Sequence, residues 1–451
     1  MVRLIAALLF SAGVLLGSVP VALAASATFG TPTAKASFGK DVIFTQPVRL
    51  DEAVSSAEIL VTFPGAAGPT VFEVPAPSGA GQQTLTYTFD LSADAHFAPN
   101  TRLSARWRLF PTAAPDAPVT GPSVSITYAD DRFAWKTQSG NIVRVHWYEG
   151  SAAFGVRALK IGEDAVASSS TLLGVAETEP IDFYVYADQA AFYGALGPGT
   201  RENVGGQANT DIRTMFALIT PAEIDASWVN IVIPHELTHL VFDTAVSNPY
   251  HFPPRWLNEG VAEYQSQGYN PSYRAAIEEA ARSGQLIPLD GLTGQFPTTF
   301  ERFNLAYAES TAAVDYLVRT YGQDALVSLV RSYASGLTDD EAFTKALGLD
   351  ATAFGDAWLA SVGAVAPTHY GPQAAAPGPV PAAWVGSPAP GTTAPPADPT
   401  SVPLSAPGAD GAGSEGDGTG SVVLPVVVIV VTIAGVFALY GWRRRQDAAD
   451  V

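Results

Sequence analysis

The sequence predicts an α+β protein in which a strand-rich first part is followed by a small sheet and then by helices. Three observations support this fold class. Residues 28–129 alternate apolar and polar side chains in short runs that Gly, Pro and Asp turns separate. Two further strand-like runs, 142–148 and 181–186, enclose a stretch of helical periodicity. After Thr220 the helical pattern dominates, which is typical of an α+β arrangement.

The strand-rich part is predicted to be a β-sandwich. Clear strand patterns occur at 41–45, 57–63, 84–89 and 102–110. About seven short strands in about 100 residues are typical of an immunoglobulin-like sandwich, formed here without a disulfide because the chain has no cysteine. We assign residues 25–130 to this domain and find no chemistry in it.

Residues 131–366 form the second predicted domain. Its helices are expected at 227–244, 256–266, 272–283, 303–320, 323–335 and 338–346. Residues 367–421 are rich in Pro, Ala, Gly, Ser and Thr and contain no Lys or Arg. Such a composition cannot bury a core, so we expect a disordered stalk there.

The two ends of the chain carry membrane signals. Residues 1–24 read as a cleaved signal peptide, because an apolar run follows Arg3 and ends in Ala22-Leu23-Ala24. The uncharged apolar run 422–442 is long enough for one transmembrane helix, and the basic start of 443–451 predicts a cytoplasmic tail. We therefore expect a cell-membrane protein with a single C-terminal helix and its N-terminal ectodomain outside the cell.

Composition excludes several classes of function. The net charge is −19 with 24 Lys and Arg residues, which argues against nucleic-acid binding because phosphates require clustered basic side chains. The absence of cysteine excludes disulfides, thiolate metal sites and a cysteine nucleophile. The sequence does not indicate an oligomeric state.

The most informative segment is His235-Glu236-Leu237-Thr238-His239, an HExxH pattern within a predicted helix. It places two imidazoles one turn apart on the same face, where they can share one zinc ion. Glu236 would lie near the open coordination position, where a general base belongs. Because Pro234 is tolerated only near the start of a helix, we expect the helix to begin close before it.

A second helix follows at 254–264 and carries two acidic residues one turn apart, Glu259 and Glu263. Glu259 can complete a His₂Glu zinc site that leaves a position for water. Glu263 can accept a hydrogen bond from a ligand imidazole. The alternative is an ordinary solvated helix face.

HELTH together with WLNEGVAEY resembles the gluzincins, and more closely the peptidase MA-like bacterial metallohydrolases, whose second motif runs W-L-x-E-G-x-A. The resemblance covers roughly residues 131–365 and implies a thermolysin-like zincin domain, a small sheet plus helices. It implies one Zn²⁺ with the ligands His235, His239 and Glu259. It also implies Glu236 as base and proton shuttle, with Glu263 and Asn258 beside the ligands.

Two softer features accompany the motifs. Related peptidases place a substrate-pairing edge strand near Gly205–Asn209, although a plain Gly-rich turn is the alternative. Because this segment lacks the Glu with which gluzincin aminopeptidases grip the substrate's amino group, it favours an endopeptidase. Tyr307 is the tentative oxyanion donor, with a core tyrosine as the alternative, and His251 is a weaker candidate.

Together these features predict a membrane-anchored extracellular zinc metallopeptidase that acts on a peptide or protein substrate, as an endopeptidase. One alternative is a surface-anchored binding or scaffold protein with an inactive or structural metal domain. Another is a zinc hydrolase that acts on a non-peptide bond.

Overall fold

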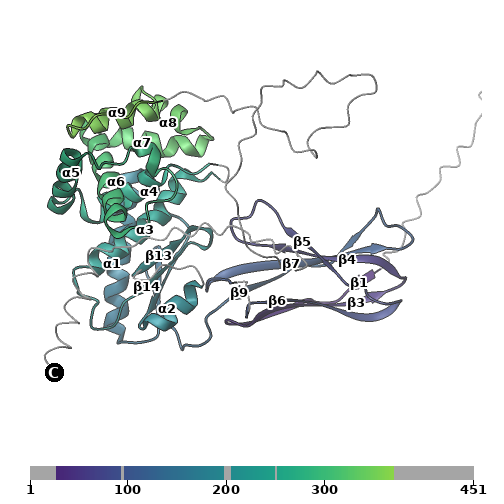
Figure 1. Cartoon of the computed structure of the whole chain (residues 1–451). Coiled ribbons are helices and arrows are strands. Elements are labelled where there is room, and N and C mark those ends of the chain that lie inside the picture. The colour runs from purple at the N-terminus through teal and green to yellow at the C-terminus, as the bar shows by residue number, and fades with distance from the viewer. Residues whose placement is uncertain (1–26, 93–95, 198–204, 249–250, 370–451) are drawn as a thin grey trace, which may run out of the picture. The chain divides into compact units, whose positions relative to one another are not determined.

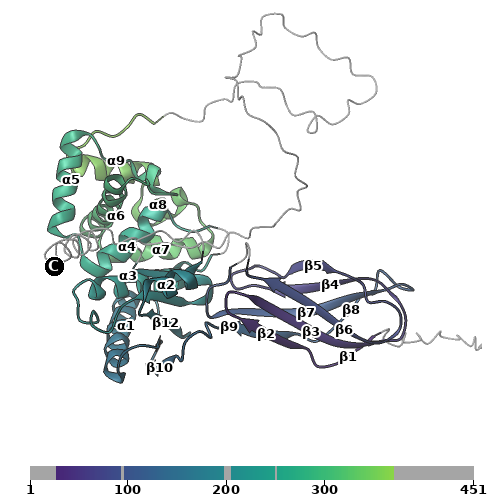
Figure 2. The same ribbon diagram turned by 60° about the horizontal axis from the view of Figure 1, so that its bottom comes forward.

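The computed structural model describes residues 27–92, 96–197, 205–248 and 251–369 (Figure 1). Strands β1–β9 come first along the chain, followed by a mixed sheet and then by a group of helices, as Figures 1 and 2 show. The described chain is therefore α+β.

The first nine strands form two antiparallel sheets. One has the order β1-β3-β2, with β6 also on β3; the other has the order β5-β4-β7-β8, with β9 also on β7. Alternate residues of β3 and β7, such as Phe44 and Trp107, are buried in one shared apolar core. The bounds are β1 Ala27–Phe29, β2 Thr33–Ser37, β3 Asp41–Leu50, β4 Val54–Thr62, β5 Thr70–Val74, β6 Gly81–Asp90, β7 Thr101–Pro111, β8 Val119–Thr120 and β9 Val124–Tyr128.

A third sheet has the order β10-β11-β12-β14-β13. Its inner strands β11, β12 and β14 run parallel, while the edge strands β10 and β13 are antiparallel to their neighbours. Helix α1 connects β11 to the parallel strand β12, as a parallel pair requires. The bounds are β10 Lys136–Ser139, β11 Val143–Trp147, α1 Ala152–Leu173, β12 Ile181–Tyr186, α2 Gln189–Leu196, β13 Gly206–Asn209 and β14 Thr214–Leu218.

The helices that follow pack on this sheet and on one another. α3 contacts α1, β13 and α4, and α4 in turn contacts α6. Six of these helices lie close to the expected ranges, whereas α9 was not expected. The bounds are α3 Val229–Val246, α4 Arg255–Gln267, α5 Pro271–Ser283, α6 Phe300–Tyr321, α7 Gln323–Ser332, α8 Asp339–Leu347 and α9 Ala351–Ser361.

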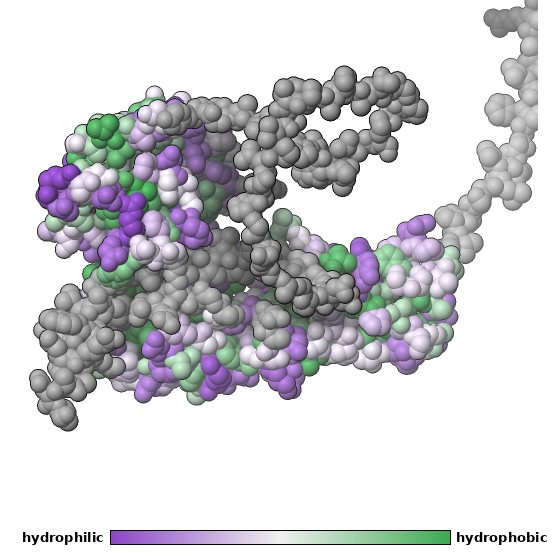
Figure 3. Space-filling model, viewed as in Figure 1, coloured by the Kyte–Doolittle hydropathy of each residue, from purple (hydrophilic) through white to green (hydrophobic). Residues whose placement is uncertain are grey.

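Apolar side chains are used mainly in the cores. The face in Figure 3 mixes hydrophilic and hydrophobic residues over the strands of the two antiparallel sheets. The large apolar side chains exposed in the described ranges are far apart in the sequence: Val71, Val156, Phe252, Phe300 and Val365.

The expected fold class needs two corrections. The thermolysin-like description of the second domain is not supported by the comparisons with solved structures below. Two short motifs predict only the two helices that carry them, and they do not predict how the other helices and strands are arranged. As for the transmembrane helix, no helix within the described ranges is long and apolar enough to cross a membrane. Even the long helices α1 and α6 carry charges, such as Lys160 and Asp315.

Several sequence predictions fall outside the described residues. These are the signal peptide at 1–24, all but the first residues of the stalk at 367–421, the run 422–442 and the tail 443–451.

Candidate metal centre

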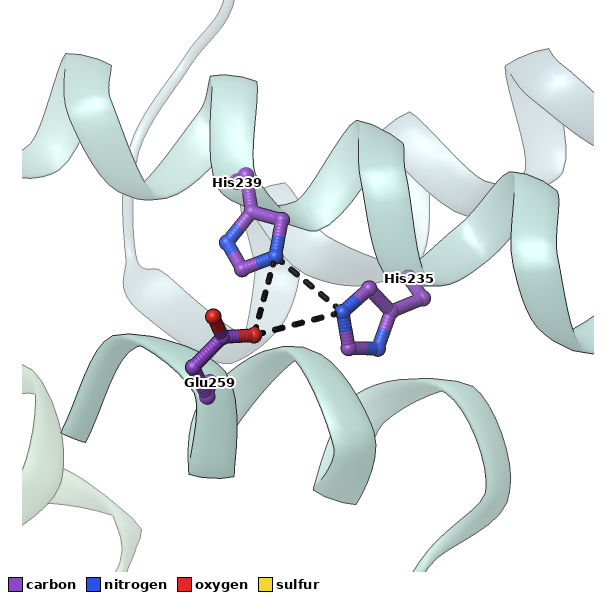
Figure 4. Close-up of side chains that lie close together, drawn as sticks. All are labelled: His235, His239 and Glu259. Atoms are coloured by element: carbon purple, nitrogen blue, oxygen red, sulfur yellow. Dashed lines mark hydrogen bonds and ion pairs between the residues drawn. The ribbon is translucent and has the colours of Figure 1, made fainter. Parts of the chain in front are cut away.

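Three side chains from two helices converge on one point (Figure 4). His235 and His239 lie on α3, and Glu259 lies on α4. The two histidine Nε2 atoms are 3.1 Å apart, and each is 3.6 Å from Glu259 Oε2. All three residues are buried, and they form the one group within the described ranges that could hold a metal ion.

The hydrogen bonds around the imidazoles determine which nitrogen atoms carry protons. His239 Nδ1 lies 3.0 Å from Asn258 Oδ1, an acceptor, so this nitrogen donates. His235 Nδ1 makes no hydrogen bond within the described residues, but it faces the Glu263 carboxylate oxygen Oε1 at 3.5 Å, which favours a proton on this nitrogen. Both Nε2 atoms are then left with lone pairs, which point at each other and at a carboxylate oxygen.

Such a group of electron-pair donors fits a cation. Glu259 Oε2 is buried and has no hydrogen-bond partner among the described residues. Ligands at zinc distances of about 2.0–2.2 Å in a tetrahedral site lie about 3.3 Å apart, close to the 3.1 and 3.6 Å separations here. The residues present therefore fit a zinc ion.

Close helix packing holds the ligands in place. A Cβ atom at Gly260 would lie 2.4 Å from the Ser310 carbonyl oxygen, so only glycine lets α4 approach α6 this closely. On the other side, the Ser169 and Thr238 hydroxyls are 2.8 Å apart and join α1 to α3. α3 begins at Val229, about two turns before His235, and Pro234 lies inside it.

The side chain of Glu236, which belongs to α3, contacts the edge strand β13. Its Oε2 accepts a hydrogen bond of 2.8 Å from the Ala208 backbone N–H. Its Oε1 is buried and has no partner within the described part of the chain. A Cβ atom at Gly206 would lie only 2.8 Å from Glu236 Cγ, so the strand approaches the glutamate at a residue without a side chain. One carboxylate oxygen is thus fixed and the other is available for chemistry.

Glu263 is held by residues that the motifs did not indicate. Its Oε2 accepts hydrogen bonds from Tyr273 on α5, at 3.2 Å, and from the Gln267 amide. The other oxygen is the one that faces His235 Nδ1. A chain of contacts therefore runs from α5 through Glu263 to the first ligand of the motif.

The structure separates the two candidate oxyanion donors. Tyr307 on α6 is 3% exposed, and its hydroxyl has no hydrogen-bond partner among the described atoms. Burial raises the pKa of Tyr307 well above its ordinary value, and the charge of Glu259 raises it further. His251 instead contacts Asp339, at 3.0 Å, and stacks on Tyr333. Of these two candidates, Tyr307 is the one that interacts with the charged residues of the metal centre.

Burial and neighbouring charges shift the pKa values of the acids and bases at the centre. Burial raises the pKa of Glu236 to about 8, and burial also raises that of Glu263. Burial lowers the pKa of His239 to about 4. For Glu259, burial acts upward but is outweighed by the neighbouring His235, His239 and Arg255, so its pKa is lowered. Glu259 is thus the anionic ligand.

Residues 161–364 match the family model of the Peptidase MA superfamily. The search of curated proteins found no match.

The search of solved structures found matches at low identity and low TM-score. An aminopeptidase N family protein from Idiomarina loihiensis has 10% identity and a TM-score of 0.39, and the match covers 68% of this chain and 71% of that one. An M1 zinc metallopeptidase from Deinococcus radiodurans has 15% identity and a TM-score of 0.34, with coverage of 75% and 92%. Legionella pneumophila aminopeptidase A has 9% identity and a TM-score of 0.34, with coverage of 73% and only 49% of its own length. The solved structures named here are described as aminopeptidases or M1 zinc metallopeptidases, and they give the thermolysin-like expectation no support.

Proposed function

Residues 161–364 belong to the Peptidase MA superfamily, as the two motifs led us to expect, and from this premise we propose that the chain is a zinc metallopeptidase. The observation that carries the proposal is the buried convergence of His235 Nε2, His239 Nε2 and Glu259 Oε2 beside an unpartnered oxygen of Glu236. A purely structural metal site has no use for Glu236, because this residue is not a ligand.

The proposed mechanism assigns a task to each side chain. His235, His239 and Glu259 would hold Zn²⁺, which when bound supplies a Lewis acid and an acidic water. Glu236 Oε1 accepts a proton from the attacking water, while the Ala208 N–H holds Oε2 in place. Glu236 then delivers this proton to the leaving amine. The Tyr307 hydroxyl donates to the oxyanion that develops on the scissile carbonyl.

The edge of β13 that pairs with no other strand in the described ranges is the proposed site of substrate binding. The Leu218 N–H donates to the Gly205 carbonyl, and hydrogen-bonded pairs alternate along an antiparallel ladder. The backbone groups of Gly206 and Ala208 therefore point away from β14, toward the side on which Glu236 lies. An extended peptide can add to this edge as a further strand.

We assign the activity to the interior of a peptide chain. An enzyme that requires a free amino terminus needs a negative group to bind it, and residues 205–209 (Gly-Gly-Gln-Ala-Asn) contain no carboxylate. This observation supports an endopeptidase. Peptides with a blocked amino terminus should then be cleaved as well as unblocked ones, and cleavage of unblocked peptides alone would refute the assignment.

The central test is Glu236→Gln in the purified protein. We expect the variant to bind zinc like the wild type and to lose cleavage of casein and of peptide libraries. The matched control is Glu309→Gln, a buried glutamate on α6 that contacts the Ile287 backbone and not the ligands. Full activity in Glu236→Gln would refute the mechanism. Zinc binding without peptide turnover in the wild type would favour a scaffold protein or a hydrolase of another bond.

A further inference from the structure

The two oxygens of Glu259 have different surroundings. Oε2 faces both histidine Nε2 atoms, whereas Oε1 accepts a hydrogen bond of 3.2 Å from Arg255 Nε. Arg255 is the first residue of α4 and lies one turn before Glu259, so its side chain covers the same helix face. The motif comparison did not indicate this residue.

Arg255 is placed differently from an ordinary helix-surface arginine. Its side chain is 18% exposed, compared with 63% for Arg319, which forms the i,i+4 pair with Asp315 on α6. Its guanidinium lies over the Phe296 ring, 4.5 Å from the centroid. Its backbone N–H donates to the Thr293 carbonyl at 2.9 Å, which anchors the start of the helix.

The position also opposes helix electrostatics. A positive charge in the first turn of a helix is unfavourable, because the N-terminal end carries partial positive charge. A buried cation at this position therefore requires a compensating interaction. Glu259 supplies such an interaction, because its Oε1 lies 3.2 Å from Arg255 Nε.

We propose that Arg255 is a positioning residue that makes Glu259 a one-oxygen ligand. A carboxylate can bind a metal through one oxygen or through both, and zinc sites can expand from four to five ligands. A charge-assisted hydrogen bond occupies Oε1 and holds the carboxylate plane, so only Oε2 is offered to the ion. The position that a second oxygen would take is then left for water. This inference rests on the proposed zinc centre.

The test compares wild type, Arg255→Met and Arg255→Lys, with Arg319→Met as the matched control. Zinc affinity is measured by competition with a chelating dye, and coordination number by X-ray absorption of the zinc-loaded proteins. In Arg255→Met we expect about 10–100-fold weaker zinc binding and a shift from four toward five ligands. Arg255→Lys, which keeps the charge, should restore part of both, and Arg319→Met should match the wild type.

The outcomes separate this inference from the proposed function. Unchanged coordination in a folded, zinc-loaded Arg255→Met would overturn the role of Arg255 and leave the peptidase standing. If Arg255→Met does not fold, Arg255→Lys decides: it should bind zinc more weakly than the wild type and shift partly toward five ligands. Four-ligand zinc of unchanged affinity in Arg255→Lys then overturns the inference. A wild-type protein that binds no zinc would overturn both proposals.

Discussion

Gly206→Ala is the most direct test of how the edge strand positions the base. The new Cβ would lie 2.7 Å from Val232 Cγ1 and 2.8 Å from Glu236 Cγ. Both neighbours belong to α3, and both atoms lie near the root of their side chains. Neither can move aside without a shift of the helix or of the strand.

The size of the effect follows from these distances. Each contact must lengthen by at least about 0.6 Å to reach 3.4 Å, the lower end of ordinary van der Waals contact. Such overpacking costs about 1–3 kcal/mol of stability. Because a misplacement of about 1 Å at a catalytic group can cost 100-fold, we expect kcat/KM to fall roughly 10–100-fold. Zinc affinity should stay close to that of the wild type, because no ligand is touched.

Peptide cleavage, zinc affinity and thermal unfolding are measured on the same preparations. The matched control is Gly294→Ala, because a Cβ there meets no atom within 4 Å and the backbone is not left-handed. Wild-type activity and stability in Gly206→Ala would refute the close approach of β13 to Glu236. Loss of zinc in parallel with activity would show that Gly206 supports the ligands and not the base.

Three further predictions concern other parts of the centre and its helices. Tyr307→Phe should lower kcat about 10²–10³-fold with KM and zinc affinity nearly unchanged, and an unaltered kcat would exclude Tyr307 as the oxyanion donor. Removing zinc with a chelator should lower the midpoint of thermal unfolding, and free zinc at 100 times its Kd should restore about 2.7 kcal/mol of unfolding free energy. Equal midpoints with and without chelator would argue against the site. Burial raises the pKa of Glu309 to about 8, so the folded state holds a proton that the unfolded state releases at lower pH. The unfolding free energy of the wild type relative to Glu309→Gln should therefore fall as pH rises from about 4.5 to 8, by at most about 1.4 kcal/mol per pH unit. A difference in unfolding free energy that stays constant across this range in urea unfolding would contradict the prediction.

Much of the centre was predictable because helix geometry is local. Residues four apart lie on one helix face, so HExxH places His235 and His239 together whatever surrounds the helix. The same periodicity places Glu263 beside Glu259, and it could also have identified Arg255, four residues before Glu259. That signal was present in the sequence but is common on helix surfaces, and only the burial of Arg255 distinguishes it.

Other parts of the protein could not be predicted in this way. The scaffold around the motifs was wrongly expected to be thermolysin-like, since two helices are compatible with more than one arrangement of the sheet. The contact of Tyr273 with Glu263 depends on where α5 folds back. α9, by contrast, lies in a range that a helical pattern could have covered, with Asp350 as its N-cap.

The sequence by itself determined the ligand types, their spacing and the helical character of the segments that carry them, because each depends on neighbours within one turn. Only the tertiary structure decided which oxygen of Glu236 is free, and only burial distinguishes the Arg255–Glu259 pair from an ordinary surface pair on a helix. Ala208 takes one oxygen of Glu236 and Arg255 takes one oxygen of Glu259, which leaves the other oxygen of each for chemistry. The first of these contacts joins residues 28 positions apart. This contact exists because Gly206 lets strand β13 approach helix α3 closely. The distance between the strand and the helix depends on how their backbones pack, and a local sequence pattern does not determine it.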